Sequence, residues 1–369
     1  MELIDFGKRS GLKIPRANIG GMRLPKDEDE AVELVRYALD RGMRYIDTSR
    51  GYGDSEIKIG KALKDGYREK AILSSKWCPW IKMVEETDDA SADCMRRRLE
   101  DSMKRLDVEV IDFYQIWNIN SRENFEKATR PGGMLDGVRR AMDEGLVRHT
   151  GITSHDSVEN LLEYLPGLDW CEVILVSYNM LDVRYAPVIE RARELGIGTI
   201  VMNPVAGGRL VGASPVLTEL AGEVGARDVP DLALRWLLSN SALDTYISGI
   251  SCKRDVDAAV AAAEAGPFDG EALAKVNDFV ASHTRKSLNF CTGCGYCKPC
   301  PQEINIPAVM ARIYEERFWG LREAAAERYR KIKGPHAGAC AACGECEARC
   351  TQKLKISEEM RYAAERFGE

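Results

Sequence analysis

Eight short runs of β-branched and apolar residues alternate with amphipathic stretches through the first 286 of the 369 residues. Each run and the stretch after it span roughly 30 residues, the length of one βα unit. The runs are almost continuously apolar, as expected for parallel strands buried on both faces. Eight such units predict a closed (β/α)8 barrel, a TIM barrel of the α/β class. An open doubly wound sheet is the alternative, which the lack of a Gly-x-Gly-x-x-Gly motif after the first run disfavours. The expected strands cover residues 17–22, 43–49, 71–77, 110–117, 147–153, 172–179, 198–204 and 244–250.

Three polar residues mark the carboxyl ends of neighbouring predicted strands, where such barrels place their working residues. Asp47 closes the second strand, Tyr52 follows in the loop, and Lys76 ends the third strand. Neighbouring strands lie only about 4.8 Å apart, so we expect the three side chains to share one polar site. A lysine ammonium there favours the phenolate form of tyrosine, and a carboxylate keeps the lysine charged. Such a phenol can donate a proton to a carbonyl oxygen. The alternative is a structural Asp47–Lys76 ion pair with Tyr52 at the rim.

Cysteine is concentrated near the C-terminus: of 12 cysteines, eight lie between residues 291 and 350. No secretory segment supports a disulfide framework, so bound metal in a reducing compartment is the expected use. Three cysteines at a period of three are typical of an iron–sulfur cluster, whereas zinc sites use two separated Cys-x-x-Cys pairs. We therefore predict two 4Fe–4S clusters, with zinc as the alternative.

The ligand assignment follows the crossed pattern of two-cluster ferredoxins, in which the fourth cysteine of each run binds the other cluster. The first run spaces its four cysteines by two residues each, and the second run lengthens only its last gap to three. The predicted ligands of cluster 1 are Cys291, Cys294, Cys297 and Cys350. Those of cluster 2 are Cys340, Cys343, Cys346 and Cys300.

Charge and hydropathy argue against a nucleic-acid-binding, membrane or secreted protein. The net charge is −6, which argues against a nucleic-acid-binding surface because such surfaces are strongly basic. No apolar run approaches the roughly 20 residues of a membrane span, and the first ten residues lack a secretory apolar region. We expect a cytoplasmic protein without a membrane or nucleic-acid partner.

Several motifs together resemble the aldo-keto reductase family, and specifically its branch with a C-terminal ferredoxin-like iron–sulfur domain. They are GGMRLP (20–25), YIDTSRGYGDSE (45–56), SSKW (74–77), GITSH (151–155), MNPVAGGRL (202–210), ALRWLLSNSALDTYISGI (233–250) and CTGCGYCKPCPQEINIP (291–307). The resemblance implies a (β/α)8 barrel over residues 1–286 and a two-cluster ferredoxin-like domain over residues 287–369. The family's catalytic Asp, Tyr and Lys fall on Asp47, Tyr52 and Lys76. Trp117 takes the place of the family's active-site histidine, and indole has one N–H donor and no acceptor.

The resemblance also implies a nicotinamide site, NADP(H) or NAD(H). Thr153 and Ser154 match the residues that hold the carboxamide, and Met202 matches the residue against the ring. The phosphate-binding residues it suggests are Gly207, Gly208, Arg209, Lys253 and Arg254. Besides Trp117, four positions depart from the family: Leu175 replaces the carboxamide-binding Gln, and the adenosine-binding set is replaced by Asp255, Ala258 and Ala259.

Three functions remain open at this stage. The first is an iron–sulfur oxidoreductase that reduces a small carbonyl or related unsaturated substrate, or oxidises the alcohol, with Tyr52 as proton donor and NAD(P)H as hydride source. The second is a nicotinamide-independent reductase that receives single electrons from a ferredoxin-like or other redox partner through the clusters. The third is an electron-carrier or binding protein on a retired enzyme scaffold.

Overall fold

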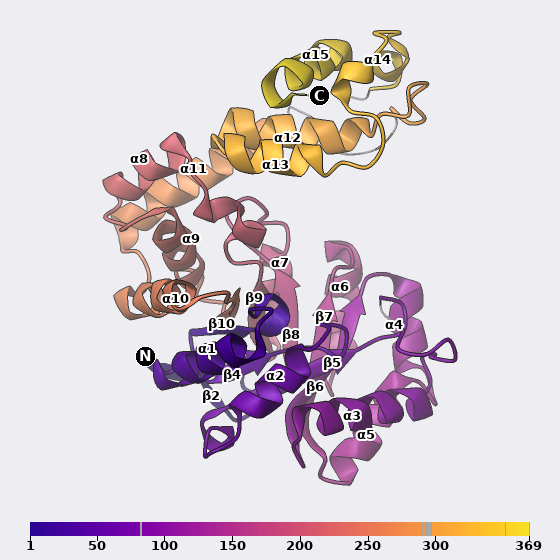
Figure 1. Cartoon of the computed structure of the whole chain (residues 1–369), viewed down its shortest axis with the longest axis vertical. Helices are drawn as coiled ribbons and strands as arrows, with labels where there is room; N and C mark the ends of the chain where they lie inside the picture. Colours follow the sequence, from indigo (N-terminus) through magenta and orange to yellow (C-terminus); the bar gives the residue numbers. More distant parts are fainter. Residues whose placement is uncertain (82, 289–290, 292–294, 296, 351, 369) are drawn as a thin grey trace. The chain divides into compact units, whose positions relative to one another are not determined.

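A computed structural model describes residues 1–81, 83–288, 291, 295, 297–350 and 352–368. Eight parallel strands close into a barrel in the order β10-β3-β4-β5-β6-β7-β8-β9 (Figure 1). Every strand lies within or next to an apolar run of the sequence, so the predicted (β/α)8 barrel is confirmed. The strands are β3 (Ala17–Gly20), β4 (Tyr45–Asp47), β5 (Ile72–Trp77), β6 (Ile111–Ile119), β7 (Val147–Ser154), β8 (Val173–Ser177), β9 (Gly198–Met202) and β10 (Thr245–Gly249).

Helices follow the strands, and serine or aspartate side chains cap the first turns of several of them, as at Asp27 and Ser91. Their buried faces carry alanine, leucine, valine and methionine at helical spacing. The α-helices are α1 (Glu28–Asp40), α2 (Ser55–Ala62), α3 (Ala92–Leu106), α4 (Arg122–Thr129), α5 (Met134–Asp143), α6 (Val158–Tyr164), α7 (Ala186–Glu194), α8 (Pro215–Glu223), α9 (Val229–Leu238) and α10 (Lys253–Ala265). Short 3-10 helices are η1 (Gly21–Arg23), η2 (Arg68–Lys70), η3 (Leu165–Gly167), η4 (Ala206–Val211) and η5 (Ala337–Ala339).

A short antiparallel hairpin precedes the barrel and was not predicted. It pairs β1 (Leu3–Asp5) with β2 (Lys13–Pro15). Phe6 follows β1, and its ring contacts those of Tyr45 and Phe113 at centroid distances of 5.7 and 5.6 Å. Tyr45 is the first residue of β4, so this aromatic cluster fills the amino-terminal end of the barrel. The opposite end is where the polar side chains lie.

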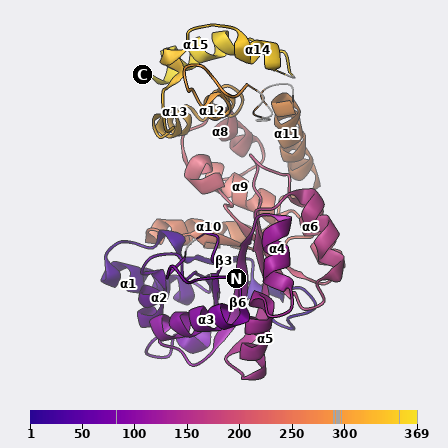
Figure 2. The same cartoon turned by 90° about the vertical axis from the view of Figure 1, so that its right-hand side faces the viewer.

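Contacts divide the chain into two compact units, which we describe separately. The barrel unit comprises residues 1–204 and 234–267, and the C-terminal unit comprises residues 205–233 and 268–369. The C-terminal unit contains α8 and the helices α11 (Gly270–Leu288), α12 (Ile306–Trp319), α13 (Arg322–Arg330), α14 (Glu345–Arg349) and α15 (Ile356–Phe367), seen from a second direction in Figure 2. Helices α12, α13 and α15 share a core built from Val309, Ile313, Tyr329, Met360 and Phe367. No helix in the described part of the chain is both long and apolar enough to span a bilayer.

Candidate active site and cysteine-lined cavities

Asp47 and Lys76 form a buried ion pair at the carboxyl end of the barrel. Asp47 is the last residue of β4, and Lys76 lies one residue before the end of β5. The two strands are adjacent, and the exposed fractions of the two residues are 2% and 1%. Lys76 Nζ donates to Asp47 Oδ1 and, at 2.8 Å, to the backbone carbonyl of Thr48. The ammonium is thus fixed in place by two acceptors from the same strand end.

Tyr52 joins this pair from the loop between β4 and α2. Lys76 Nζ lies 4.9 Å from the centroid of the Tyr52 ring. Trp117 on β6 also lies beside that ring, at 5.6 Å between centroids and perpendicular to it. The structure therefore brings together all four residues that the sequence nominated as catalytic.

Burial controls the electrostatics of the site. It raises the pKa of the Tyr52 phenol, and the charge and hydrogen bond of Lys76 oppose that rise without cancelling it. Burial alone would lower the pKa of Lys76, yet attraction to Asp47 and Tyr52 leaves that pKa raised. Tyr52 is therefore a protonated phenol next to an ammonium at neutral pH. This differs from the expectation that lysine would favour the phenolate in the resting site, because the sequence could not show the extent of burial.

Trp117 is held by residues that sequence analysis missed. A Cβ placed on Gly51 would lie 2.5 and 2.7 Å from two ring carbons of Trp117, so only glycine fits against the indole. The next residue, Asn118, has a positive φ of 54° and donates its backbone N–H to Thr153 Oγ1 at 2.7 Å. Its carbonyl accepts the indole N–H of Trp80 at 2.7 Å. The only sequence signal for this arrangement was the glycine-containing loop that carries Tyr52.

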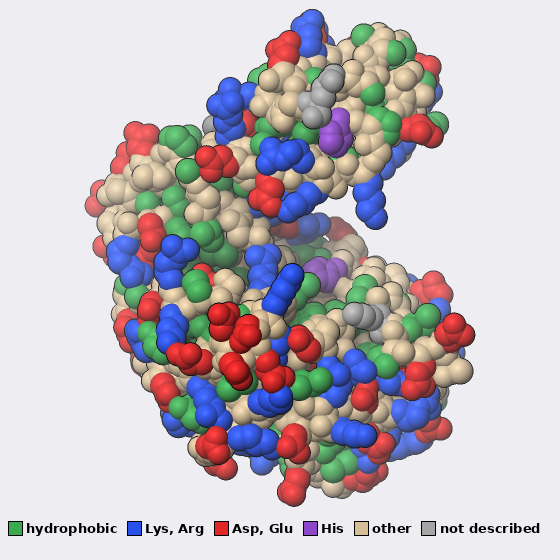
Figure 3. Space-filling model, in the orientation of Figure 1, with side chains coloured by type: hydrophobic (Ala, Val, Ile, Leu, Met, Phe, Trp, Pro, Cys, Tyr) green, Lys and Arg blue, Asp and Glu red, His purple; other side chains and the backbone are tan. Residues whose placement is uncertain are grey.

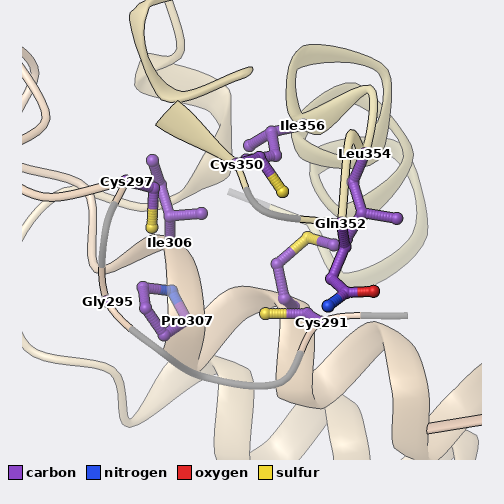
Figure 4. Close-up of a pocket in the computed structure, with 10 residues that line it drawn as sticks. Cys291, Gly295, Cys297, Ile306, Pro307, Cys350, Gln352, Leu354 and Ile356 are labelled. Carbon is purple, nitrogen blue, oxygen red and sulfur yellow. The ribbon is translucent and has the colours of Figure 1, made fainter. Parts of the chain in front are cut away.

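Cysteines line two cavities in the C-terminal unit. Cys291, Cys297 and Cys350 surround the first, and Figure 4 shows their sulfur atoms on three sides of it. Apolar residues complete its wall, among them Ile306, Met310, Leu354 and Ile356. These cysteines are three of the four predicted ligands of cluster 1, and the fourth, Cys294, lies outside the described residues.

The second cavity is lined by all four cysteines predicted for cluster 2: Cys300, Cys340, Cys343 and Cys346. Cys297 and Ile306 line both cavities, so the two share a wall. Among the described residues, no three His, Cys, Asp or Glu side chains are grouped around a point suited to one metal ion. Four cysteines around one cavity supply the four thiolates that a 4Fe–4S cluster binds. The cysteine sets therefore fit iron–sulfur clusters.

Comparison with known proteins decides the family. A model of the aldo/keto reductase family matches residues 17–281. The chain belongs to the aldo/keto reductase family. A model of the 4Fe-4S dicluster domain matches residues 290–355, directly after it.

Relatives of this aldo/keto reductase match 75% of the chain. It is 27% identical to an uncharacterized oxidoreductase, YrpG, of Bacillus subtilis (strain 168), over 75% of this chain and 95% of that protein. It is 29% identical to an L-galactose dehydrogenase of Arabidopsis thaliana, over 75% and 93% of the two chains. Among solved structures, the holo form of aldo-keto reductase AKR11C1 from Bacillus halodurans superposes with a TM-score of 0.65, at 26% identity over 75% and 96% of the chains. The protein is therefore an oxidoreductase with a 4Fe–4S domain.

The nicotinamide-ring residues expected in this reductase lie at the ends of β7 and β9. Thr153 and Ser154 end β7, and both are buried. The Ser154 hydroxyl donates to the carbonyl of Ile119 at 2.6 Å and accepts the N–H of Asp156 at 3.1 Å. Met202 ends β9 and is half-buried. Leu175, opposite Thr153 on β8, is buried with the apolar core and offers no polar group.

Lys253 at the phosphate end and Asp255 at an adenosine position are engaged within the protein. Lys253 pairs with Glu33 on the surface, and Arg254 beside it is exposed. Asp255, at an adenosine position, accepts the backbone N–H of the N-cap residue Cys252 at 3.3 Å and so caps α10. Ala258 and Ala259 on that helix carry no polar side-chain atom. These observations make the fit to a dinucleotide partial, because Leu175 offers no polar group at the ring end and Ala258 and Ala259 offer none at the adenosine end.

The glycine loop belongs to the C-terminal unit. Gly207 and Gly208 have positive φ values of 70° and 96° within η4. Arg209 donates to the carbonyl of Ala206 at 2.9 Å and to Glu315 Oε1 on α12 at 2.7 Å. A side chain expected to hold pyrophosphate thus already has a carboxylate partner.

Proposed function

We propose that this aldo/keto reductase reduces a small organic carbonyl or a related unsaturated substrate, or oxidises the corresponding alcohol, with Tyr52 as the proton donor. The observation that carries the proposal is the position of Lys76 Nζ, fixed by Asp47 and Thr48 and 4.9 Å from the Tyr52 ring. NAD(P)H is the proposed source of hydride. When bound, it would transfer to the substrate one hydride, which is a hydrogen with two electrons.

The chain's own residues supply proton transfer and charge control. Tyr52 remains protonated because burial raises its pKa, so it can hydrogen-bond to a carbonyl oxygen and give that oxygen its proton. As the phenol loses its proton, negative charge develops close to the Lys76 ammonium, which stabilises it. Asp47 keeps the ammonium oriented and charged, and its second oxygen, Oδ2, has no hydrogen-bond partner among the described residues.

Trp117 changes what the site can do beside this proton donor. Indole can donate one hydrogen bond and cannot accept a proton, so Trp117 leaves proton donation to Tyr52. Its ring also occupies more of the site than an imidazole would. Trp117 therefore acts on substrate orientation and pocket shape, which is why the substrate class includes unsaturated compounds related to carbonyls.

We further propose that Cys291, Cys294, Cys297 and Cys350 hold one 4Fe–4S cluster and that Cys300, Cys340, Cys343 and Cys346 hold the other. The described members of the first set line the first cavity, and all four cysteines of the second set line the second, with Cys297 at the wall that the two cavities share. This arrangement supports the crossed assignment. Bound clusters would pass electrons one at a time, whereas NAD(P)H transfers a hydride.

A second function is favoured by residues at several positions of the expected dinucleotide site. Arg209 is paired with Glu315, Asp255 caps a helix, and Leu175 is apolar. Each reduces the affinity expected for a dinucleotide. In this function, a ferredoxin-like redox partner supplies electrons through the clusters, and Tyr52 still supplies the proton.

Anaerobic titration separates the two functions. Protein with intact clusters is titrated with NADPH, NADH and dithionite while binding and cluster absorbance are recorded. Nicotinamide binding supports the first function, and bleaching by dithionite without nicotinamide binding supports the second.

Tyr52→Phe tests the proton donor that both functions share. We expect it to lower kcat/KM for carbonyl reduction by about 100-fold or more. The control is Tyr67→Phe, which removes a hydroxyl that contacts Asp40 outside the site. Full activity in Tyr52→Phe would refute the proposed role.

A further inference from the structure

The loop that carries Tyr52 is tied at its start to the strand that carries Lys76. The Ser49 hydroxyl and the backbone N–H of Arg50 both donate to the carbonyl oxygen of Lys76, at 3.0 and 3.1 Å. The support differs on the other side of Tyr52. Gly53 is exposed, and a Cβ placed on it would meet no described atom within 4 Å, so packing does not restrain the loop there.

Arg105 on α3 restrains this second half of the loop. Its Nη2 donates to the backbone carbonyl of Gly53, and its Nε donates to Glu56 Oε2 at 2.9 Å. Glu56 lies in the first turn of α2, the helix that follows the loop. A guanidinium group is planar, and its donors have a fixed arrangement. Arg105 therefore holds the loop and the next helix in one geometry.

Glu56 extends these contacts to β5. Its Oε1 accepts a hydrogen bond from the Ser75 hydroxyl at 2.7 Å, and both residues are fully buried. Ser75 immediately precedes Lys76 on this strand. The contacts, together with the peptide bonds between sequence neighbours, thus close a ring behind the site. In order, its members are Arg105, Glu56, Ser75, Lys76, Tyr52 and Gly53.

Burial distinguishes the Arg105–Glu56 pair from the surface ion pairs of α3. Figure 3 shows Lys and Arg side chains interspersed with Asp and Glu over the face of the barrel unit in view. Arg96 on the same helix pairs with Glu144, and these two side chains are 22% and 52% exposed. The Glu56 side chain is 0% exposed, so the cost of removing it from water offsets most of its attraction to Arg105. Orientation is therefore the main contribution expected of this pair.

We propose that Arg105 is a positioning residue that keeps Tyr52 within reach of the Lys76 ammonium. The inference rests on the proposed function, in which Tyr52 donates the proton. Without Arg105, the second half of the loop loses its restraint, and the phenol moves relative to an ammonium that Asp47 still holds. The ammonium stabilises the negative charge that develops on the phenol, so a larger separation slows proton donation. Arg105 acts through the loop and through Glu56.

The test uses the full-length, cluster-containing protein prepared without oxygen. Arg105→Met alone would leave the buried Glu56 carboxylate without its cation and would be strongly destabilising. The test variant is therefore Arg105→Met/Glu56→Gln, which removes both charges. The matched control is Arg96→Met/Glu144→Gln, which removes an exposed pair from the same helix. Circular dichroism verifies that both variants fold.

The first readout is the pKa of Tyr52, followed by NMR of protein isotope-labelled at the tyrosine Cζ, with Tyr52→Phe for the assignment. Burial raises this pKa, Lys76 opposes the rise, and the Asp47 charge adds to it. Trp117 still packs on the ring in the test variant, so separation from Lys76 should raise the pKa of Tyr52 further. The control variant should titrate as the wild type does. A change in stability alone would not move this pKa.

The second readout is the rate of benzaldehyde reduction, with NADPH or dithionite as the reductant. We expect kcat to fall by about tenfold or more in the test variant and KM to change little. The titration needs no substrate, so it decides the geometry even where the wild type does not reduce benzaldehyde. An unchanged or lowered pKa of Tyr52, or an unchanged kcat, would overturn the inference.

The failure of this inference is distinguishable from that of the proposed function. Full activity in Tyr52→Phe would refute the proposed function. An inactive Tyr52→Phe beside a test variant that matches the control would refute only the role of Arg105.

Discussion

The two reactive regions of this reductase are assembled in different ways. At the mouth of the barrel, Lys76 is bound by Asp47 and by a backbone carbonyl, and Tyr52 packs on Trp117. Each side chain has its partner in the chain itself. In the C-terminal unit, the cysteines line cavities, and the groups that would link them are metal clusters. The barrel site is therefore preorganised by protein contacts, whereas the cysteine region depends on what it binds.

Of the changes that test this contrast, removal of the iron should have the largest effect. Metal binding contributes directly to folding free energy where the site is not held by other contacts. We expect chelation under oxidising conditions to abolish the calorimetric unfolding transition of the C-terminal unit and to leave that of the barrel unit in place. The measurement is differential scanning calorimetry with iron analysis on the same samples.

The variant Cys350→Ser should cause an intermediate change in the C-terminal transition, with the iron content falling from about eight to about four atoms per chain. An unaltered C-terminal transition after complete iron loss would contradict the contrast.

Removing Lys76 should have the next largest effect. Lys76→Met leaves the buried Asp47 carboxylate without its partner, and breaking such a pair costs about 3–5 kcal/mol of unfolding free energy. The double variant Asp47→Asn/Lys76→Met removes both charges and should recover most of that stability. Activity should stay low in both variants, because neither has an ammonium beside Tyr52.

Denaturant unfolding and kcat/KM measured on the same samples separate the two roles of this pair. Recovery of activity together with stability in the double variant would show that the charges serve folding alone. The exposed pair of Lys70 and Asp40 provides the control, and Lys70→Met should change stability little.

The barrel was predictable because its signal is periodic and repeated. Eight apolar runs with helices between them leave few alternatives, and all eight strands were found. The β1–β2 hairpin escaped prediction because strands of three residues are too short to show an alternating pattern. Asp47, Tyr52 and Lys76 were predictable from their position at strand ends, and the cysteines from their spacing.

The features that could not be predicted depend on contacts between residues that are far apart in the sequence. Nothing next to Gly51 in the sequence shows that an indole lies against it, and nothing in η4 shows that Arg209 pairs with Glu315. The raised pKa of Tyr52 was missed for the same reason, since burial is a property of the folded barrel. Spacing identifies the chemical groups, and packing decides their charge and their partners.

Substitution of Gly51 tests how closely the barrel site is packed, and the expected loss of stability is smaller. Gly51→Ala would place a methyl group 2.5 Å from the Trp117 ring, which must then move. Overpacking of this kind costs about 1–3 kcal/mol. In a Trp117→His background the ring is smaller, and the same substitution should cost much less. Thermal unfolding of the four proteins in this double-mutant cycle measures the coupling, and additive effects would show that the contact is unimportant. Gly53→Ala in the same loop serves as a spatial control, because nothing lies within 4 Å of its Cβ, although its positive φ adds strain.

The smallest effect expected is the response of carbonyl reduction to pH. Reduction needs Tyr52 in its protonated form, and burial raises its pKa above the ordinary value of 10.0. A group with a raised pKa stays protonated below that pKa and loses its proton only as the pH rises through it. The rate of proton donation should therefore be flat from about pH 6 to about pH 9 and fall at higher pH, whereas alcohol oxidation should rise there. Single-turnover rates across this range, with Tyr52→Phe as the baseline, provide the measurement. A decline in reduction near pH 7 would mean that Lys76 outweighs burial and that the resting phenol is already ionised.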